Sequence, residues 1–139
     1  MAGYSGTPLM VKLGIKAGHR VALLRPPADI SRILGELPDR AVIVKRPTRD
    51  IDVVLLFARR QAVLADGIIK GRRLLAAAGG LWLCWPKRAA RQPTNLTESI
   101  VRDAGLAIGL VDTRVGAIDE TWSGLKFVYR LKDRAIIGA

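Results

Sequence analysis

The chain has 139 residues, enough for one domain with a hydrophobic core, and we predict a single domain over residues 1–139. No apolar run is long enough for a membrane-spanning helix and no secretory leader opens the sequence, so we expect a cytoplasmic protein without membrane association. One cysteine and one histidine exclude an internal disulfide and a cysteine/histidine zinc site, and we expect no bound metal.

Two helix–strand pairs are predicted in the first 44 residues. Thr7 is typical of an N-cap and Pro8 of the first helical position, where the missing N–H of proline costs nothing. The apolar run that follows His19 is typical of a buried strand, and two prolines end it. We predict a helix at 8–13, a strand at 20–24, a helix at 28–37 and a strand at 41–44.

The middle of the chain predicts the centre of a sheet. Residues 50–57 are almost continuously apolar after two aspartates, as in a strand covered on both faces. The link at 45–49 is too short for a helical crossover, so we expect the strand at 41–44 to be a short or irregular edge. Residues 60–78 predict the longest helix, ending at Gly79 and Gly80 in a left-handed C-cap. A buried strand at 81–85 follows, and Pro86 ends it.

The last third predicts one helix and a hairpin. Asn95 is expected to cap a helix that ends near Gly105 or Gly109, with Glu98 at the capping-box position. Two strand-like segments, 113–118 and 125–131, are separated by a turn-rich stretch too short for a helix. The predicted fold class is α/β, a three-layer, Rossmann-like, mostly parallel sheet of about six strands with a C-terminal antiparallel hairpin.

One set of residues resembles the class I methyltransferases. The run 12–21 (KLGIKAGHRV) resembles the approach to their first strand, 52–55 their fourth strand, and 75–83 the approach to their fifth. This resemblance implies a Rossmann-like core. However, Arg25-Pro26-Pro27 stands where those enzymes have an acidic residue and a glycine-rich turn, and the second strand ends without a carboxylate for a ribose diol. We therefore expect no cofactor, and S-adenosylmethionine-dependent methyl transfer remains an alternative.

A second resemblance spans the chain from end to end. YSGTPL at 4–9, WPK at 85–87, NLTE at 95–98, GLVD at 109–112 and DETWSG at 119–124 are similar to landmarks of a family of small bacterial proteins classed as a domain of unknown function. The combination is specific to that family. It implies relatives and no particular activity.

Basic, acidic and aromatic residues follow the predicted strands at their carboxyl ends, the edge where open α/β sheets bind ligands. Guanidinium groups bind phosphates and carboxylates, but charged residues also follow buried strands because the chain returns to water there. We expect these residues to share one rim. The candidate ligand-binding residues are Arg25, Arg59, Arg60, Trp85, Lys87, Arg88, Asp119, Glu120 and Trp122.

Several of these candidates have a simpler structural explanation. Packing under the hairpin is preferred for Trp85 and Trp122 over stacking on a planar ligand. Hydrogen bonds within a turn are preferred for Asp119 and Glu120 over an acid–base role. The only histidine is expected at the opposite edge of the sheet and Cys84 inside a strand, so we predict no catalytic residue.

The formal net charge of +11 would attract polyanions. It is divided almost equally between the two halves of the chain and forms no basic tail, so nucleic-acid binding is possible but not favoured. We expect a non-catalytic binding or regulatory domain for an anionic small molecule or an acidic protein segment. The alternatives are a methyltransferase and non-specific nucleic-acid binding.

Overall fold

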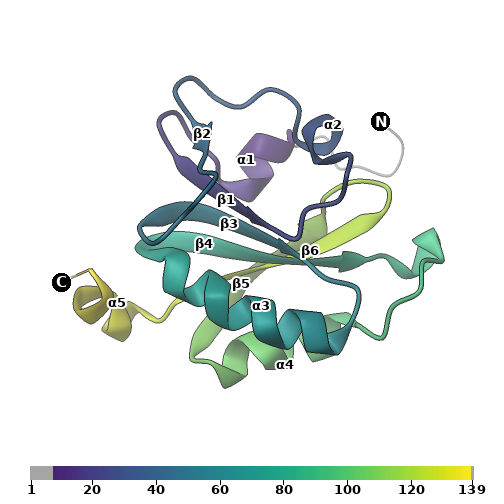
Figure 1. Cartoon of the computed structure of the whole chain (residues 1–139). Coiled ribbons are helices and arrows are strands. Elements are labelled where there is room, and N and C mark those ends of the chain that lie inside the picture. The colour runs from purple at the N-terminus through teal and green to yellow at the C-terminus, as the bar shows by residue number, and fades with distance from the viewer. Residues whose placement is uncertain (1–7, 139) are drawn as a thin grey trace.

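The structure, a computed structural model, describes residues 8–138 and contains one six-stranded sheet with helices on both faces (Figure 1). The strands are β1 (Arg20–Leu24), β2 (Val42–Ile43), β3 (Ile51–Phe57), β4 (Leu75–Pro86), β5 (Leu110–Ala117) and β6 (Trp122–Tyr129). The helices are α1 (Leu9–Leu13), α2 (Ile30–Leu34), α3 (Gln61–Leu74), α4 (Glu98–Ala107) and α5 (Leu131–Ile137), with a 3-10 turn η1 (Arg88–Ala90). The proposed N-cap Thr7 and the landmark residues 4–7 lie outside the described residues.

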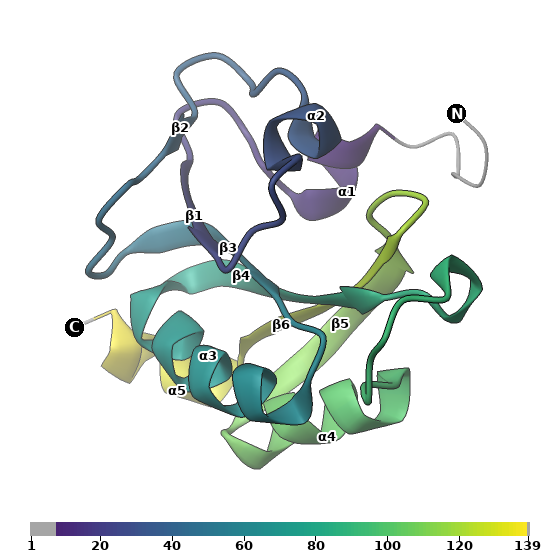
Figure 2. The ribbon, with the colours of Figure 1, turned by 45° about the vertical axis from the view of Figure 1, so that its right-hand side comes forward.

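The strand order is β2-β1-β3-β4-β6-β5, in which β2, β1, β3 and β4 are parallel and β6 is antiparallel to both of its neighbours. Helices α1 and α2 cover one face of the sheet, and α3 and α4 cover the other (Figure 2). This arrangement confirms the predicted α/β, three-layer, Rossmann-like class with an antiparallel C-terminal hairpin. No helix among residues 8–138 is both long and apolar enough to cross a bilayer.

Successive side chains of a strand point to opposite faces of the sheet, so the hydrophobic core consists of two clusters, one on each face. Leu55 and Trp82 pack with α1 and α2, whereas Leu56 and Leu83 pack with α3 and α4. Trp82 is fully buried and its indole Nε1 donates to the carbonyl of Leu13 in α1. Trp82 is therefore a core residue, and Trp85 lies on the opposite face of the sheet.

The strand β2 confirms the expected short edge, because only Val42 and Ile43 pair with β1. The preceding helix α2 is shorter than the predicted 28–37. It ends at Gly35, whose φ of 67° leaves the helical region.

The helix predicted at 60–78 ends at Leu74, and the left-handed C-cap predicted at Gly79 and Gly80 is wrong. Both glycines lie inside β4, next to an irregularity where the register jumps from Ile51 opposite Leu75 to Val53 opposite Gly80. A Cβ on Gly79 would lie 2.9 Å from two carbonyl oxygens of β3. Close approach of two backbones therefore explains the glycine, rather than a helix end.

The predicted cap of the fourth helix is also wrong. Thr97 is the N-cap of α4, and its Oγ1 accepts the N–H of Ile100 at 3.2 Å. Asn95 instead accepts the N–H of Gln61, the first residue of α3, at 2.8 Å. Asn95 thus caps a different helix from the one that it precedes.

The C-terminal hairpin differs from prediction at its ends. The strand β5 begins at Leu110 rather than at residue 113, and β6 runs from Trp122 to Tyr129 rather than over 125–131. Helix α5 was not predicted. Its apolar residues Leu131 and Ile136 are 78% and 76% exposed, so they do not give the pattern of a helix with a buried face.

Candidate functional site

Six of the nine candidate residues line two separate hollows at the carboxyl edge of the sheet, and Asp119, Glu120 and Trp122 line neither of them. Arg25, Arg59 and Arg60 line a hollow of about 270 Å³ above the ends of β1 and β3, which we call the β1–β3 hollow. Trp85, Lys87 and Arg88 line another of about 520 Å³ between the end of β4 and the start of α4, which we call the β4–α4 hollow.

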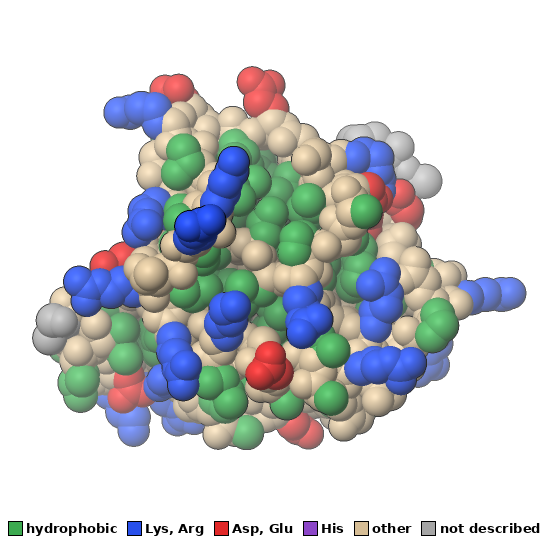
Figure 3. Space-filling view, in the orientation of Figure 1, with side chains coloured by type: hydrophobic (Ala, Val, Ile, Leu, Met, Phe, Trp, Pro, Cys, Tyr) green, Lys and Arg blue, Asp and Glu red, His purple; other side chains and the backbone are tan. Residues whose placement is uncertain are grey.

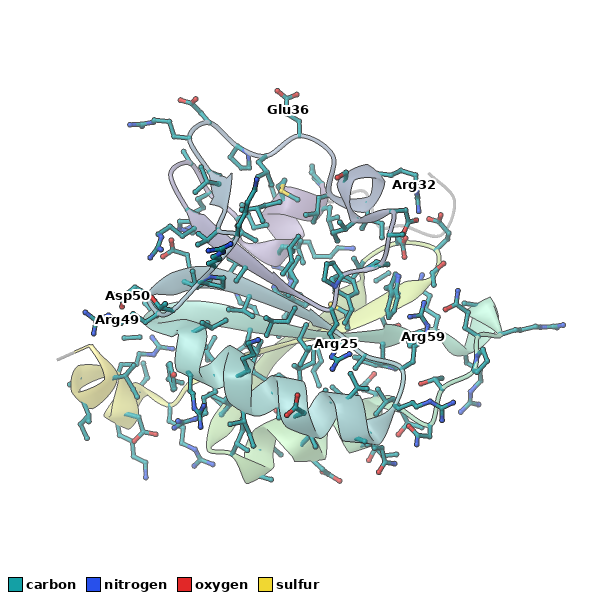
Figure 4. The ribbon with its side chains drawn as sticks, viewed as in Figure 1. Arg25, Arg32, Glu36, Arg49, Asp50 and Arg59 are labelled. Carbon is teal, nitrogen blue, oxygen red and sulfur yellow. The ribbon has the colours of Figure 1, made fainter. Side chains whose placement is uncertain are left out.

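Arg25 turns the chain immediately after β1. Its φ of 51° is left-handed, a conformation that costs a residue with a side chain about 1 kcal/mol or more relative to glycine. The side chain is exposed and lies near Arg59 in the β1–β3 hollow (Figure 4). An arginine therefore occupies a backbone position at which glycine would be relaxed.

Arg59 is held in place by three kinds of contact. Its Nε and Nη2 donate to Oε1 of Gln92 at 3.2 and 3.1 Å, and its Cζ lies 4.8 Å from the ring centroid of Trp122. Its carbonyl accepts the Oγ1–H of Thr94 at 2.6 Å. Because Gln92 lines the β4–α4 hollow, the Arg59 side chain lies between the two hollows.

Arg60 is the N-cap residue of α3 and is exposed. The first turn of α3 contains no acidic residue, so no side chain there neutralises the positive end of the helix dipole. The lining of the β1–β3 hollow contains no acidic residue either. Its electrostatic character is therefore positive.

The two tryptophans at this edge are buried. Trp122 is 2% exposed and packs edge-to-face on Phe57, with ring centroids 5.0 Å apart and an interplanar angle of 85°. Trp85 is 6% exposed and belongs to the core beneath α3 and α4. Core packing accounts for the burial of both rings.

Asp119 has the hydrogen bonds expected of a turn residue. Its Oδ1 accepts the N–H groups of Thr121 and Trp122 at 2.8 and 2.7 Å, and the residue is buried. Glu120 is exposed and lies 3.5 Å from a guanidinium nitrogen of Arg32. Neither carboxylate lines the β1–β3 hollow.

Arg32 is a structurally important residue that the sequence did not single out. It lies 2.6 Å from Asp29, 3.6 Å from Asp119 and 3.5 Å from Glu120, and so joins α2 to the β5–β6 turn. Its hydrogen bond lowers the pKa of Asp29. From the sequence, only the ion pair of Asp29 and Arg32 could be expected, because these residues are three apart on a helix. Asp119 and Glu120 come close to Arg32 only in the folded structure.

The β4–α4 hollow has mixed charge. Lys87 and Arg88 line it together with Glu98, which forms an ion pair with Arg102 at 2.9 Å. The backbone N–H of Lys87 donates to the carbonyl of Thr121, so the position of the loop after β4 depends on the hairpin. This hollow is less specifically suited to an anion than the β1–β3 hollow.

The residues of a nucleophilic triad are not assembled among residues 8–138. His19 precedes β1 at the amino edge, where its Nδ1 accepts the N–H of Lys16. Cys84 is buried, and burial raises the pKa of its thiol, so the thiolate is disfavoured. No group of three or more histidine, cysteine or acidic side chains suited to a metal ion occurs in the described part of the chain.

Lysine and arginine side chains are spread over the face shown in Figure 3 and do not gather in one patch. The net charge is therefore not focused on a single surface of that face.

A family model described as "Protein of unknown function (DUF3052)" matches residues 27–131. The chain belongs to the DUF3052 family. This membership agrees with the resemblance to a domain of unknown function, although it does not test the individual landmark motifs. No curated protein matches the sequence significantly.

Several solved structures similar to this family member are described as methyltransferases. A SAM-dependent methyltransferase from Aquifex aeolicus is 13% identical, with a TM-score of 0.52 and 86% of each chain covered. A TehB-like SAM-dependent methyltransferase from Corynebacterium glutamicum is 10% identical, with a TM-score of 0.55 and coverage of 93% and 91%. The M1A22 tRNA methyltransferase TrmK of B. subtilis is 11% identical, with a TM-score of 0.52 and coverage of 93% and 68%. At these identities the similarity shows the fold alone.

Proposed function

We propose that this chain is a non-catalytic binding or regulatory domain that recognises an anionic group in the β1–β3 hollow. The observation that carries the proposal is the convergence of Arg25, Arg59 and Arg60 on one hollow whose lining contains no acidic residue. None of the three forms an ion pair with an acidic residue that the structure describes.

Electrostatics favours an anion at this place. Three arginines line the hollow and the start of α3 adds further positive potential, so the site is electrostatically suited to a phosphate or carboxylate. Arginine also binds such groups through two parallel hydrogen bonds. The left-handed backbone of Arg25 supports the same reading, because strained residues are retained where a function requires them.

The size of the site favours recognition of one anionic group of a larger ligand. A hollow of about 270 Å³ is smaller than the pockets of about 300–1,000 Å³ that enclose whole drug-sized ligands. The remainder of such a ligand would extend over Arg59 toward Lys87 and Arg88 in the β4–α4 hollow. Either a small metabolite or an acidic protein segment has this chemistry.

Thermal unfolding with inorganic phosphate, pyrophosphate and citrate tests the proposal, since a ligand that binds only the native state raises the Tm. We expect at least one of these anions to raise the Tm of the unaltered protein. The shift should be lost in Arg25→Gly, which relaxes the backbone, and in Arg60→Ala. It should persist in Arg46→Ala, which removes the same charge at an exposed site elsewhere. Equal shifts in all of these variants, or no shift with any anion, would refute the proposal.

A double variant, Lys87→Ala with Arg88→Ala, separates the two hollows. If the ligand extends from one hollow to the other, this variant should weaken binding of pyrophosphate or citrate more than that of phosphate. Its unliganded Tm should stay close to that of the unaltered protein, because the side chain of Arg88 is exposed and that of Lys87 is only partly buried.

Binding of S-adenosylmethionine is the second candidate, and the observation that favours it is the fold shared with proteins described as SAM-dependent methyltransferases. The turn Arg25-Pro26-Pro27 opposes it, because prolines remove amide donors and add bulk where backbone must approach a ligand. Calorimetry with S-adenosylmethionine and S-adenosylhomocysteine decides between the candidates. Tight, stoichiometric binding of either would establish the methyltransferase cofactor, and we expect none.

A further inference from the structure

A hollow of about 380 Å³ lies at the amino ends of β1, β3 and β4, on the opposite edge of the sheet from the β1–β3 hollow. Small residues, among them Gly14 and Gly80, form part of its wall, and Lys16, Asp52 and Lys126 supply charged groups. We call it the amino-end hollow. Nothing in the anion-binding proposal uses it.

The side chain of Lys126 occupies space left by two glycines. A Cβ on Gly80 would lie 2.5 Å from Cε of Lys126, and a Cβ on Gly14 would lie 3.4 Å from its Nζ. A side chain at Gly80 would therefore displace the lysine, and one at Gly14 would press on its amine. The glycines allow the amine of Lys126 to line the hollow rather than extend freely into solvent.

The surroundings of this amine are positively charged. Lys126 on β6 pairs directly with Arg114 on β5, and like charges opposite each other destabilise a sheet. Lys16 from the loop before β1 adds a third cation. Lys126 forms no ion pair with an acidic residue within the described range 8–138. A charge arrangement that costs stability without a compensating partner indicates a use for the amine.

The other polar groups near this amine are already engaged. Asp52 on β3 also lines the hollow, but its Oδ2 accepts the N–H of Arg20 at 2.8 Å. Arg114 does not line the hollow, and its Nη1 donates to the carbonyl of Lys12 at 3.5 Å. His19 lines the hollow and accepts the N–H of Lys16.

Partial burial, together with the charges of Arg114 and Lys16, lowers the pKa of Lys126. More of this lysine is therefore the neutral amine near neutral pH than would be so for an ordinary lysine. The neutral amine is the nucleophile toward carbonyl groups, and an adjacent cation is an established means of activating it. The same cations would attract a carboxylate on the incoming molecule.

We propose that Lys126 is a nucleophilic amine that condenses reversibly with a small 2-oxo acid, whose carboxylate is attracted by Lys16 in the wall of the hollow and by Arg114 beside it. The Nζ of the neutral amine adds to the ketone carbon to form a carbinolamine. The carbonyl oxygen then leaves as water with the two hydrogens of the amine, and a carbon–nitrogen double bond forms. The step needs no oxidant or reductant, and hydrolysis reverses it.

Reductive trapping tests this proposal. The full chain is incubated with pyruvate and cyanoborohydride near neutral pH, and the adduct at each lysine is quantified by peptide mass spectrometry. We expect Lys126 to be labelled several-fold faster than Lys45, Lys70 and Lys132, which are all exposed. Labelling of Lys126 no faster than that of the exposed lysines would overturn the proposal.

Replacing Arg114 tests both effects of its charge, the lowered pKa of Lys126 and the attraction of the carboxylate, and an aldehyde without a carboxylate tests the amine alone. Arg114→Gln should slow the labelling of Lys126 several-fold without changing Lys70, whereas Arg114→Lys should retain most of the rate. An unchanged rate in Arg114→Gln would overturn the assigned role of Arg114. Acetaldehyde, which lacks a carboxylate, should still label Lys126 faster than Lys70, and failure to do so would overturn the activated amine.

The pH dependence provides a further readout. The rate of labelling at Lys126 should reach its plateau at a lower pH than the rates at the exposed lysines, and coincident profiles would contradict the proposal. Arg46→Ala should leave the labelling unchanged, because it removes a charge at an exposed residue that does not line the amino-end hollow. The two hollows lie at opposite edges of the sheet, so the outcome is independent of anion binding in the β1–β3 hollow.

Discussion

The guanidinium carbon of Arg59 lies 4.8 Å from the ring centroid of Trp122. Arg59 comes shortly after the end of β3, whereas Trp122 is the first residue of β6. Phe57 packs against the same ring edge-to-face. The contacts of Phe57 and Arg59 with Trp122 therefore connect the end of β3 to the start of β6. The position of one arginine of the β1–β3 hollow depends on a tryptophan of the C-terminal hairpin.

Replacing Trp122 by alanine should destabilise the fold and disturb the site together. Loss of a buried tryptophan typically costs about 3–5 kcal/mol of the free energy of unfolding. Denaturation in urea measures this cost. Trp122→Phe should restore most of the stability and much of the anion-dependent Tm shift, because an aromatic face remains beneath Arg59. A stability loss below about 1 kcal/mol for Trp122→Ala would contradict the observed packing.

Asn95→Ala should destabilise the protein through α3 rather than α4. Removing an N-cap side chain costs about 1 kcal/mol, with a range of about 0.5–2. Hydrogen exchange should show faster exchange in the first turn of α3, where Gln61 loses its acceptor. Thr97→Ala is the matched control, since it should affect the first turn of α4 instead. Indistinguishable exchange patterns in the two variants would disagree with this assignment.

Gly105→Ala should destabilise the protein even though alanine is the better helix former. A Cβ at residue 105 would lie 2.0 Å from Cε2 of Phe127, so the packing of α4 against β6 must shift. Overpacking of this kind costs about 1–3 kcal/mol, more than the gain of about 1 kcal/mol in helix propensity. Phe127→Leu in the Gly105→Ala background should recover part of the loss. Urea titrations of the single and double variants measure the coupling, and additive effects would count against the contact.

Cys84 should be inert to thiol reagents in the native protein. It is 2% exposed, and burial raises the pKa of its thiol. Reaction with a disulfide reagent should therefore proceed only as fast as the protein opens. Because the folded protein retains this proton after the unfolded chain has lost it, stability should fall as the pH rises above about 9, the ordinary pKa range of a thiol. Cys84→Ala should show a shallower alkaline decline, and identical declines would contradict this account.

The strands were the most predictable part of the fold. Apolar runs such as 51–57 and 81–85 are strands because burial on both faces demands continuous hydrophobicity, and the structure confirms both. The short edge strand β2 was predicted from the length of the link at 45–49, which is too short for a helical crossover. These features depend on local sequence, so the sequence was sufficient for them.

The wrong predictions concern residues whose type suggested a local role but whose actual role is a contact with a distant part of the chain. The Gly79-Gly80 pair is a common helix-end signal, but here the glycines admit the backbone of β3 and the side chain of Lys126. Asn95 has the residue type and position of a cap for α4, but it caps α3. In the candidate site, the strand ends place most of the proposed residues at the carboxyl edge, but the sequence did not indicate the division of this edge into two hollows or the contacts of Arg32. The contacts of Arg32 depend on the packing of the hairpin against α2.

The strand order also determines which part of the molecule should open last. The strands β3 and β4 come from the middle of the chain and lie at the centre of the sheet, with a paired neighbour on either side. Val54, Leu55 and Leu56 of β3 are fully buried, whereas both residues of β2 are exposed. Amide protons of β3 should therefore exchange only through global unfolding, and those of β2 through local fraying. Fraying of the edge strands β2 and β5 would leave β1 and β6, the paired neighbours of this slowest-exchanging unit, in place.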